Sequence, residues 1–178
     1  KFKLLQDLAE RKGRNDSGLM VIEGAQEIEL ALSHGMRIDG SFICPTRIKT
    51  DADRHLFNVM TKYQLQPLEF DEKLFAKITY MQSSCALLVI KQPGIKLSVL
   101  KPSASDFVLV VVGIEKPGNL GALVRTADAV GAKAVIVADP HIDPWNPNAL
   151  RGSRGSILSV PIVEASSEQT LAWLKENA

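Results

Sequence analysis

Cysteine and histidine are scarce in this sequence, and their scarcity limits the kinds of site that the chain can form. Among 178 residues there are two cysteines and three histidines. Cys44 and Cys85 are too few for a disulfide framework, and the histidines show no ligand spacing relative to them. We therefore expect no metal site, and a structural or incidental role for both cysteines.

Long apolar runs and a strong excess of one charge are also missing. No run approaches the roughly 20 apolar residues that cross a bilayer, and the charged first residues lack the apolar core of a signal peptide. A net charge of +1 excludes a surface of uniformly positive potential, although nucleic-acid binding needs only a local patch. We expect a cytoplasmic protein without a membrane partner.

A strand, a polar turn and a helix follow one another in the second half of the chain. Residues 107–113 are almost continuously apolar and rich in valine, which predicts a strand buried on both faces. Residues 115–118 predict a turn, and Asn119 is a suitable helix N-cap. In an α/β sheet, ligands bind where such a turn follows the carboxyl end of a strand. The turn is therefore a candidate site.

The predicted helix after this turn has two sides of different character. Leu123, Val124 and Ala127 recur at helical spacing and are expected to pack on the sheet. Arg125 falls on another side, where its side chain would pass over Gly121 toward the carboxyl edge of the sheet. The alternative is that Gly121 only permits a tight turn and that Arg125 faces solvent. The glycine spacing matches neither a dinucleotide-binding fingerprint nor a nucleotide P-loop.

A second strand and a polar segment come next. Residues 134–138 predict a strand that completes a βαβ unit with parallel pairing. Residues 139–148 are too rich in proline and asparagine for a helix and should lie beside the candidate turn. Arg151, Ser153 and Arg154 then occupy a turn, rich in glycine and serine, that could wrap a phosphate. The alternative is a flexible connection whose arginines face water.

The pattern predicts two domains. Residues 93–105 interrupt the periodicity with proline, glycine and serine, which predicts a linker between residues 1–92 and residues 106–178. Helices and strands alternate on both sides of it, so the fold class is α/β throughout. We expect a small α/β domain first and a Rossmann-like parallel sheet second.

The start of the chain is basic. Its first fourteen residues contain five basic side chains and two acidic ones. By itself such a cluster is more often a solvated helix face than a surface for nucleic acid.

Several segments together resemble one known family. The pattern Asn-x-Gly-x-x-x-Arg-Thr-Ala at residues 119–127, with Gly-Ala at 131–132, looks like the first signature motif of the SpoU (TrmH) branch of the SPOUT RNA methyltransferases. Residues 149–156, followed by Val-Pro at 160–161, look like the Arg-x-Ser-x-Gly stretch of that family. Residues 1–25, a basic helix and a strand ending in Glu-Gly, are similar to the opening of its RNA-binding domain.

The resemblance implies an activity and a role for each candidate residue. The activity is methyl transfer from S-adenosylmethionine to a ribose 2′-hydroxyl of structured RNA, rRNA more than tRNA, by a homodimer. Arg125 would bind the phosphate beside the acceptor and stabilise the developing alkoxide, because arginine stays protonated at ordinary pH. Asn119 would hold the turn and help to orient Arg125 or the ribose. The expected RNA-binding residues are Lys12, Arg14, Arg151, Ser153 and Arg154.

The end of the chain departs from the family pattern. The second and third motifs of the family, which form its knot and supply most contacts to S-adenosylmethionine, should follow the region where the chain stops. Residues 164–178 instead predict an N-capped amphipathic helix. The cofactor-binding residues are therefore unassigned and expected beyond Ala178, and the 178-residue chain alone should bind the cofactor weakly or not at all.

Two other functions stay open. One is a non-catalytic RNA-binding protein, or an inactive fragment of such an enzyme, whose second domain is a scaffold. The other is a small-molecule α/β enzyme, which is disfavoured because the chain has no nucleophile–base or paired-carboxylate constellation. Glu23 in the first domain is expected to be structural, for example by bonding backbone at its turn.

Overall fold

The computed structural model describes residues 1–177, and the chain divides into two compact units. The first unit comprises Lys1–Gln92 and the second begins at Pro93. Among the helices of residues 1–177, none combines the length and the apolar character that a membrane crossing requires.

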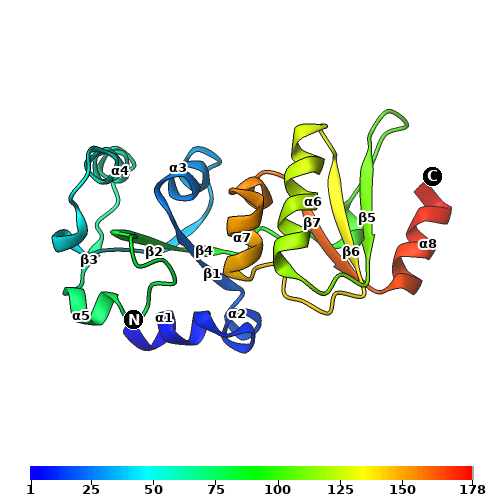
Figure 1. The fold of residues 1–178 in the computed structure, drawn as a ribbon. Coiled ribbons are helices and arrows are strands. Elements are labelled where there is room, and N and C mark those ends of the chain that lie inside the picture. The colour runs from blue at the N-terminus through cyan, green and yellow to red at the C-terminus, as the bar shows by residue number, and fades with distance from the viewer. Residues whose placement is uncertain (178) are drawn as a thin grey trace. The chain divides into compact units, whose positions relative to one another are not determined.

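The first unit is a four-stranded sheet with helices on both faces (Figure 1). The strands lie in the order β1-β4-β2-β3. The central strand β4 pairs antiparallel with β1 and β2, while β2 and β3 are parallel. The elements are α1 (Phe2–Ala9), α2 (Arg11–Ser17), β1 (Leu19–Glu23), α3 (Ala25–Ser33), β2 (Ile38–Ile43), a 3-10 turn (Pro45–Arg47), α4 (Asp51–Lys62), β3 (Leu68–Glu69), α5 (Glu72–Phe75) and β4 (Ala86–Lys91).

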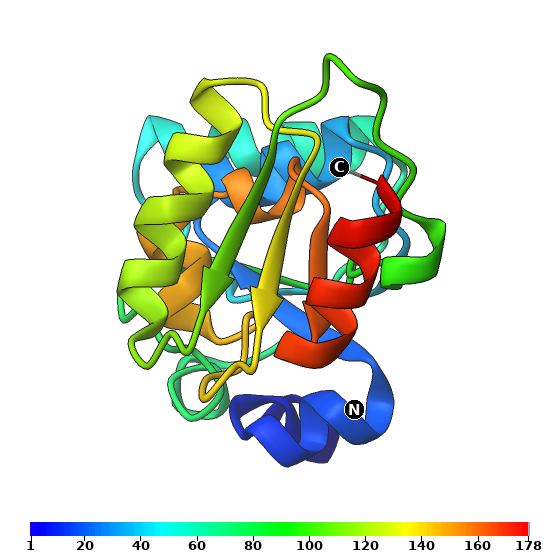
Figure 2. The same cartoon turned by 90° about the vertical axis from the view of Figure 1, so that its right-hand side faces the viewer.

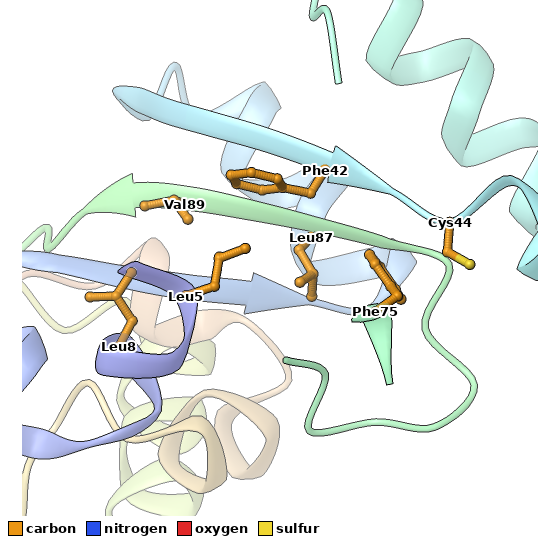
Figure 3. Close-up of a cluster of buried hydrophobic side chains, with 7 residues drawn as sticks. All are labelled: Leu5, Leu8, Phe42, Cys44, Phe75, Leu87 and Val89. Carbon is orange, nitrogen blue, oxygen red and sulfur yellow. The ribbon is translucent and has the colours of Figure 1, made fainter. Parts of the chain in front are cut away.

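One buried cluster shows how the sequence pattern builds this unit (Figure 3). Leu5 and Leu8 lie on one face of α1, three residues apart, and Leu87 and Val89 are alternate residues of β4. The two periodicities bring these side chains together, and full burial of one leucine stabilises the fold by roughly 1.5–3 kcal/mol. The whole cluster consists of Leu5, Leu8, Phe42, Cys44, Phe75, Leu87 and Val89.

The second unit is a parallel three-stranded sheet in the order β5-β6-β7 (Figure 2). Helices α6 and α7 lie on one face of this sheet and α8 lies on the other (Figure 1). This arrangement confirms the α/β class and the βαβ unit that the sequence predicts. The elements are a 3-10 turn (Leu97–Val99), β5 (Val108–Val112), α6 (Pro117–Ala129), β6 (Ala134–Ala138), α7 (Pro147–Ser153), a 3-10 turn (Ser156–Leu158), β7 (Ile162–Ala165) and α8 (Ser167–Asn177).

Part of the expected linker is packed into this second unit. Leu100 is buried in the same cluster as Trp173 of α8, with Ile95 and Leu97 packed against it. The amide of Ile95 also donates to the carbonyl of Ile162, at the start of β7, over 3.0 Å. The apolar residues among the prolines and serines of residues 93–105 therefore anchor the segment.

The prediction for β5 is wrong in one respect. Its residues are apolar like those of a strand covered on both faces, yet Val108–Val112 are only partly buried and Val112 is 65% exposed. The five residues of β6, in contrast, are all buried. The reason is position: within residues 1–177, β6 is the central strand and β5 lies at an edge.

Polar residues begin two of the helices in this unit. The Asn146 side chain accepts a hydrogen bond from the amide of Asn148 over 2.8 Å, and Pro147 occupies the first position of α7. Residues 139–148, expected to be free of helix, thus include a helix start. The predicted N-capped helix at the end of the chain is confirmed, since Ser166 and Gln169 exchange hydrogen bonds at the start of α8. Ala178 lies outside the described residues.

Candidate active site and RNA-binding residues

The candidate turn lies at the carboxyl edge of the parallel sheet. β5 and β6 end in register, with Val112 opposite Ala138, and the amide of Gly113 donates to the carbonyl of Ala138 over 3.0 Å. The turn that leads to α6 and the segment that leads to α7 therefore begin side by side. This edge is where ligands bind in open parallel sheets.

Asn119 does not cap the helix that follows. Helix α6 begins at Pro117, its N-cap is Lys116, and no side chain bonds to its first amides. Asn119 lies in the first turn of the helix and is exposed. Proline fits this first position because its fixed φ suits a helix and the position needs no N–H. The predicted capping role of Asn119 is wrong, while its place beside the carboxyl edge agrees with the prediction.

Helices α6 and α7 are in close backbone contact, so the two sequence motifs meet in space. A Cβ placed on Gly121 would lie 2.6 Å from the carbonyl oxygen of Ala149 and 2.6 Å from the amide of Ser153. A Cβ on Gly152 would lie 3.1 Å from the carbonyl oxygen of Gly118. Glycine is needed here because any side chain would push the helices apart.

This contact overturns the expected path of the Arg125 side chain. The side of α6 at Gly121 is buried under α7, so it is not an open channel to the sheet edge. Leu123, expected on the sheet, is instead 37% exposed. Arg125 follows the first helical residue by eight positions, which places it about 12 Å along the axis from the carboxyl edge.

Arg125 is nevertheless available to a ligand. Its side chain is exposed, and among residues 1–177 it forms no hydrogen bond or ion pair. A guanidinium that no carboxylate neutralises can offer its fork of N–H donors to a phosphate or to a developing oxyanion. The geometry thus favours a ligand that approaches α6 from solvent.

The expected phosphate-binding turn of Arg151, Ser153 and Arg154 lies at the end of helix α7. Ser153 is fully buried; its hydroxyl donates to the carbonyl of Leu150 over 2.7 Å and accepts from the amide of Ile157 over 3.4 Å. Its role is therefore structural, contrary to the prediction. Arg151 and Arg154 are exposed, and Arg154 ends α7 in the left-handed region with φ of 51°. These two arginines stay candidates for RNA contacts.

Arg14 is not an RNA-binding residue. Its side chain is 2% exposed, and one guanidinium nitrogen donates to the carbonyl oxygens of Leu8 and Ala9 over 2.7 and 2.8 Å. These carbonyls end helix α1 and have no partner within that helix. A positive side chain at this end also suits the helix dipole. Arg14 therefore joins α2 to α1 inside the fold.

Lys12 is exposed but has acidic neighbours. It lines a hollow on the surface of α1 and α2 together with Asp7, Glu10 and Asp16. Three carboxylates beside one ammonium group would repel a phosphate backbone. The hollow therefore does not support the predicted RNA contact of Lys12.

Replacing Arg14 tests its structural role. We expect Arg14→Ala to lower the free energy of unfolding by roughly 1.5–3 kcal/mol, because two carbonyls lose a charged donor. Arg11→Ala, an exposed change in the same helix, should stay within about 0.5 kcal/mol of the wild type. Urea denaturation followed by circular dichroism measures both. Equal stability of the two variants would contradict this assignment.

Glu23 is structural, as the sequence predicts, but its partners are distant in sequence. Its carboxylate accepts hydrogen bonds from the amides of Tyr80 and Met81 over 2.6 and 2.8 Å. The Glu-Gly end of β1 is therefore tied to the segment that precedes β4. The sequence pattern marks Glu23 but not these partners, because no sequence signal marks a pairing across more than fifty residues.

Both cysteines lie in the interior. Cys44 belongs to the cluster of Figure 3, and burial raises the pKa of the Cys85 thiol to about 11. Among residues 1–177, no group of histidine, cysteine, aspartate or glutamate side chains is arranged to hold a metal ion.

Two family models match the two units of the chain. Residues 106–178 match the SpoU rRNA methylase family, and residues 1–88 match an MRM3-like substrate binding domain. The second unit of the chain is therefore a SpoU methylase domain, and the first unit matches a substrate binding domain.

Individual relatives agree with this assignment. The chain is 29% identical to the 23S rRNA (guanosine(2553)-2′-O)-methyltransferase RlmP of Bacillus subtilis over 98% of its length. It is 33% identical to an RNA 2′-O ribose methyltransferase of known crystal structure, with a TM-score of 0.79 over 99% of this chain and 66% of that one.

A further solved structure shares the fold. It is the SpoU methyltransferase AviRb from Streptomyces viridochromogenes in complex with the cofactor AdoMet, 24% identical with a TM-score of 0.84, over 98% of this chain and 66% of that one. The chain spans 57–66% of the length of the curated relatives that it matches over most of its own length.

Proposed function

We propose that the protein carrying this chain transfers a methyl group from S-adenosylmethionine to a ribose 2′-hydroxyl of rRNA. The observation that carries the proposal is the exposed Arg125 on α6, which lies within the family's first motif and in a helix packed against the Arg-x-Ser-x-Gly stretch on α7. The names of the relatives, which are 2′-O-methyltransferases acting on 23S rRNA, support this substrate. A substrate binding domain at residues 1–88 supports a macromolecular acceptor.

The chemistry assigns Arg125 an electrostatic role. S-adenosylmethionine supplies a methyl group on a positively charged sulfur. The acceptor oxygen forms a bond to the methyl carbon, the carbon–sulfur bond breaks with its electron pair left on sulfur, and the hydroxyl proton passes to solvent. Arg125 stabilises the negative charge that develops on this oxygen and binds the neighbouring phosphate. Arg125 does not take up the hydroxyl proton, because a guanidinium group is already protonated at ordinary pH.

Methylation of rRNA by the full-length protein tests the proposal. We expect transfer of radioactive methyl from S-adenosylmethionine to a 23S rRNA transcript, at a nucleotide that then resists alkaline cleavage because its 2′-hydroxyl is blocked. Binding of the transcript without methyl transfer would favour the non-catalytic RNA-binding protein instead. Neither binding nor transfer would contradict both functions.

Assembly and location are parts of the same proposal. We propose a homodimer, as the family resemblance implies, and a location in the cytoplasm. Light scattering on the purified full-length protein measures the dimer, and cell fractionation measures the location.

A further inference from the structure

The segment between α5 and β4 is held at one end by a carboxylate. The two oxygens of Glu23 accept separate hydrogen bonds, from the amide of Tyr80 over 2.6 Å and from the amide of Met81 over 2.8 Å. Both bonds go to backbone, so they define the path of the chain whatever side chains it carries. We call residues 79–83 the Tyr80 loop.

A guanidinium holds the other end of the Tyr80 loop. One nitrogen of Arg47 donates to the carbonyl of Ser84 over 3.1 Å and to the hydroxyl of Thr79 over 3.4 Å. The same guanidinium pairs with Glu72 over 2.7 Å and lies 5.2 Å from the ring centre of Phe75. The hydrogen bond from Arg47 lowers the pKa of Glu72, so the pair stays charged at neutral pH. Both ends of the loop are therefore fixed.

The clamped loop presents an aromatic ring to solvent. Tyr80 is 53% exposed, more than any other aromatic side chain of the first unit, and Gln82 and Ser83 beside it are exposed as well. Glu23 and Arg47 thus fix the backbone of the loop, while the ring of Tyr80 stays outside the core. An exposed aromatic ring can stack on an unpaired base, and amide and hydroxyl groups can bond to base edges.

The charges around the Tyr80 loop suit RNA better than those of the α1–α2 hollow. Lys73 and Lys77 are exposed in the segment that leads to the loop, and the carboxylates of Glu23 and Glu72 are engaged by the loop amides and by Arg47. The hollow beside Lys12, in contrast, is lined by three carboxylates. A phosphate backbone would be attracted to the first surface and repelled by the second.

We propose that the Tyr80 loop contacts unpaired bases of the RNA substrate, with Tyr80 stacked on one base and Glu23 and Arg47 acting as positioning residues. This inference rests on the proposed function, because it assumes that RNA is the substrate. The inference specifies which part of the first unit contacts the RNA. It also specifies that the contacted nucleotides are unpaired.

Filter binding of a 23S rRNA transcript to the full-length protein tests the loop. We expect Tyr80→Ala to weaken binding roughly 5- to 100-fold, the loss expected for one base stack. Tyr80→Phe keeps the ring and should bind within about threefold of the wild type. Tyr63→Ala is the matched control, since Tyr63 is a tyrosine of the same unit with 45% exposure, at the end of α4. It should bind like the wild type.

A double-mutant cycle tests the positioning role of Glu23. Glu23→Gln leaves one oxygen to accept and places an NH₂ group against an amide donor, so it should misplace the loop and weaken binding. If Glu23 acts through Tyr80, the same change should have little further effect in the Tyr80→Ala background. A general loss of stability would instead weaken binding equally in both backgrounds. Equal losses would overturn the positioning role.

The outcomes separate this inference from the proposed function. A wild-type protein that does not bind the transcript overturns both. A wild-type protein that binds and methylates it, together with Tyr80→Ala at unchanged affinity, overturns the inference alone. Ultraviolet cross-linking gives an independent check that does not depend on any variant. The peptide that contains Tyr80 should carry the cross-linked nucleotide, and its absence from the cross-linked peptides would also overturn the inference.

Discussion

Replacing Arg125 by alanine should lower the rate of methyl transfer by the full-length protein roughly 100- to 1,000-fold. This is the usual cost of removing one donor from the charge that develops in a transition state. The side chain is exposed and forms no bond within residues 1–177, so the variant should fold and melt like the wild type. Single-turnover assays with saturating RNA measure the rate separately from binding.

Two further variants sharpen this test. Arg125→Lys should not restore the rate, because an ammonium group lacks the planar fork that binds two oxygens at once. Lys133→Ala removes a positive charge at the opposite edge of the sheet, just before β6 begins, and should leave the rate unchanged. A rate for Arg125→Ala near that of the wild type would remove this arginine from the mechanism.

Replacing Gly121 by alanine should destabilise the second unit by roughly 1–3 kcal/mol, the usual cost of overpacking. The new Cβ would lie 2.6 Å from backbone atoms of α7, and backbone cannot rotate away as a flexible side chain can. Helices α6 and α7 would have to separate, which would displace both sequence motifs. Methyl transfer should therefore fall together with stability.

A neighbouring glycine provides the matched control. A Cβ on Gly118 would meet nothing within 4 Å, and alanine is the better helix former, so Gly118→Ala should be neutral or stabilising by up to about 1 kcal/mol. Denaturation followed by tryptophan fluorescence reports on the second unit, because both tryptophans, Trp145 and Trp173, belong to it. Equal stability of the two variants would contradict the close contact of α6 and α7.

The main elements could be predicted because they depend on neighbours in the sequence. The apolar run of residues 134–138 is a buried strand, and the Ser-x-x-Gln pattern at Ser166 begins α8. The burial of β5 was overestimated because the same apolar pattern suits central and edge strands. The start of α7 was missed because proline and asparagine favour both loops and helix starts.

Only the part of the candidate site that depends on neighbours in the sequence could be predicted. The motif residues Asn119 and Arg125 were found from their spacing, and both are exposed on α6. The burial of Ser153 and Arg14 could not be read from the sequence, because each bonds to backbone that only folding brings near. Basic residues close together in sequence can differ in burial: Lys12 is exposed beside carboxylates, whereas Arg14 is buried.

By itself the sequence determined the α/β class, most strands and helices, and the resemblance to one family. These features follow from local periodicity and from motifs whose residues are close along the chain. Only the tertiary structure decided that α7 covers Gly121, that Arg14 bonds inside the fold and that Glu23 holds the Tyr80 loop. Such facts depend on which distant segments meet, and neither side-chain spacing nor composition encodes the partner of a hydrogen bond across a folded chain.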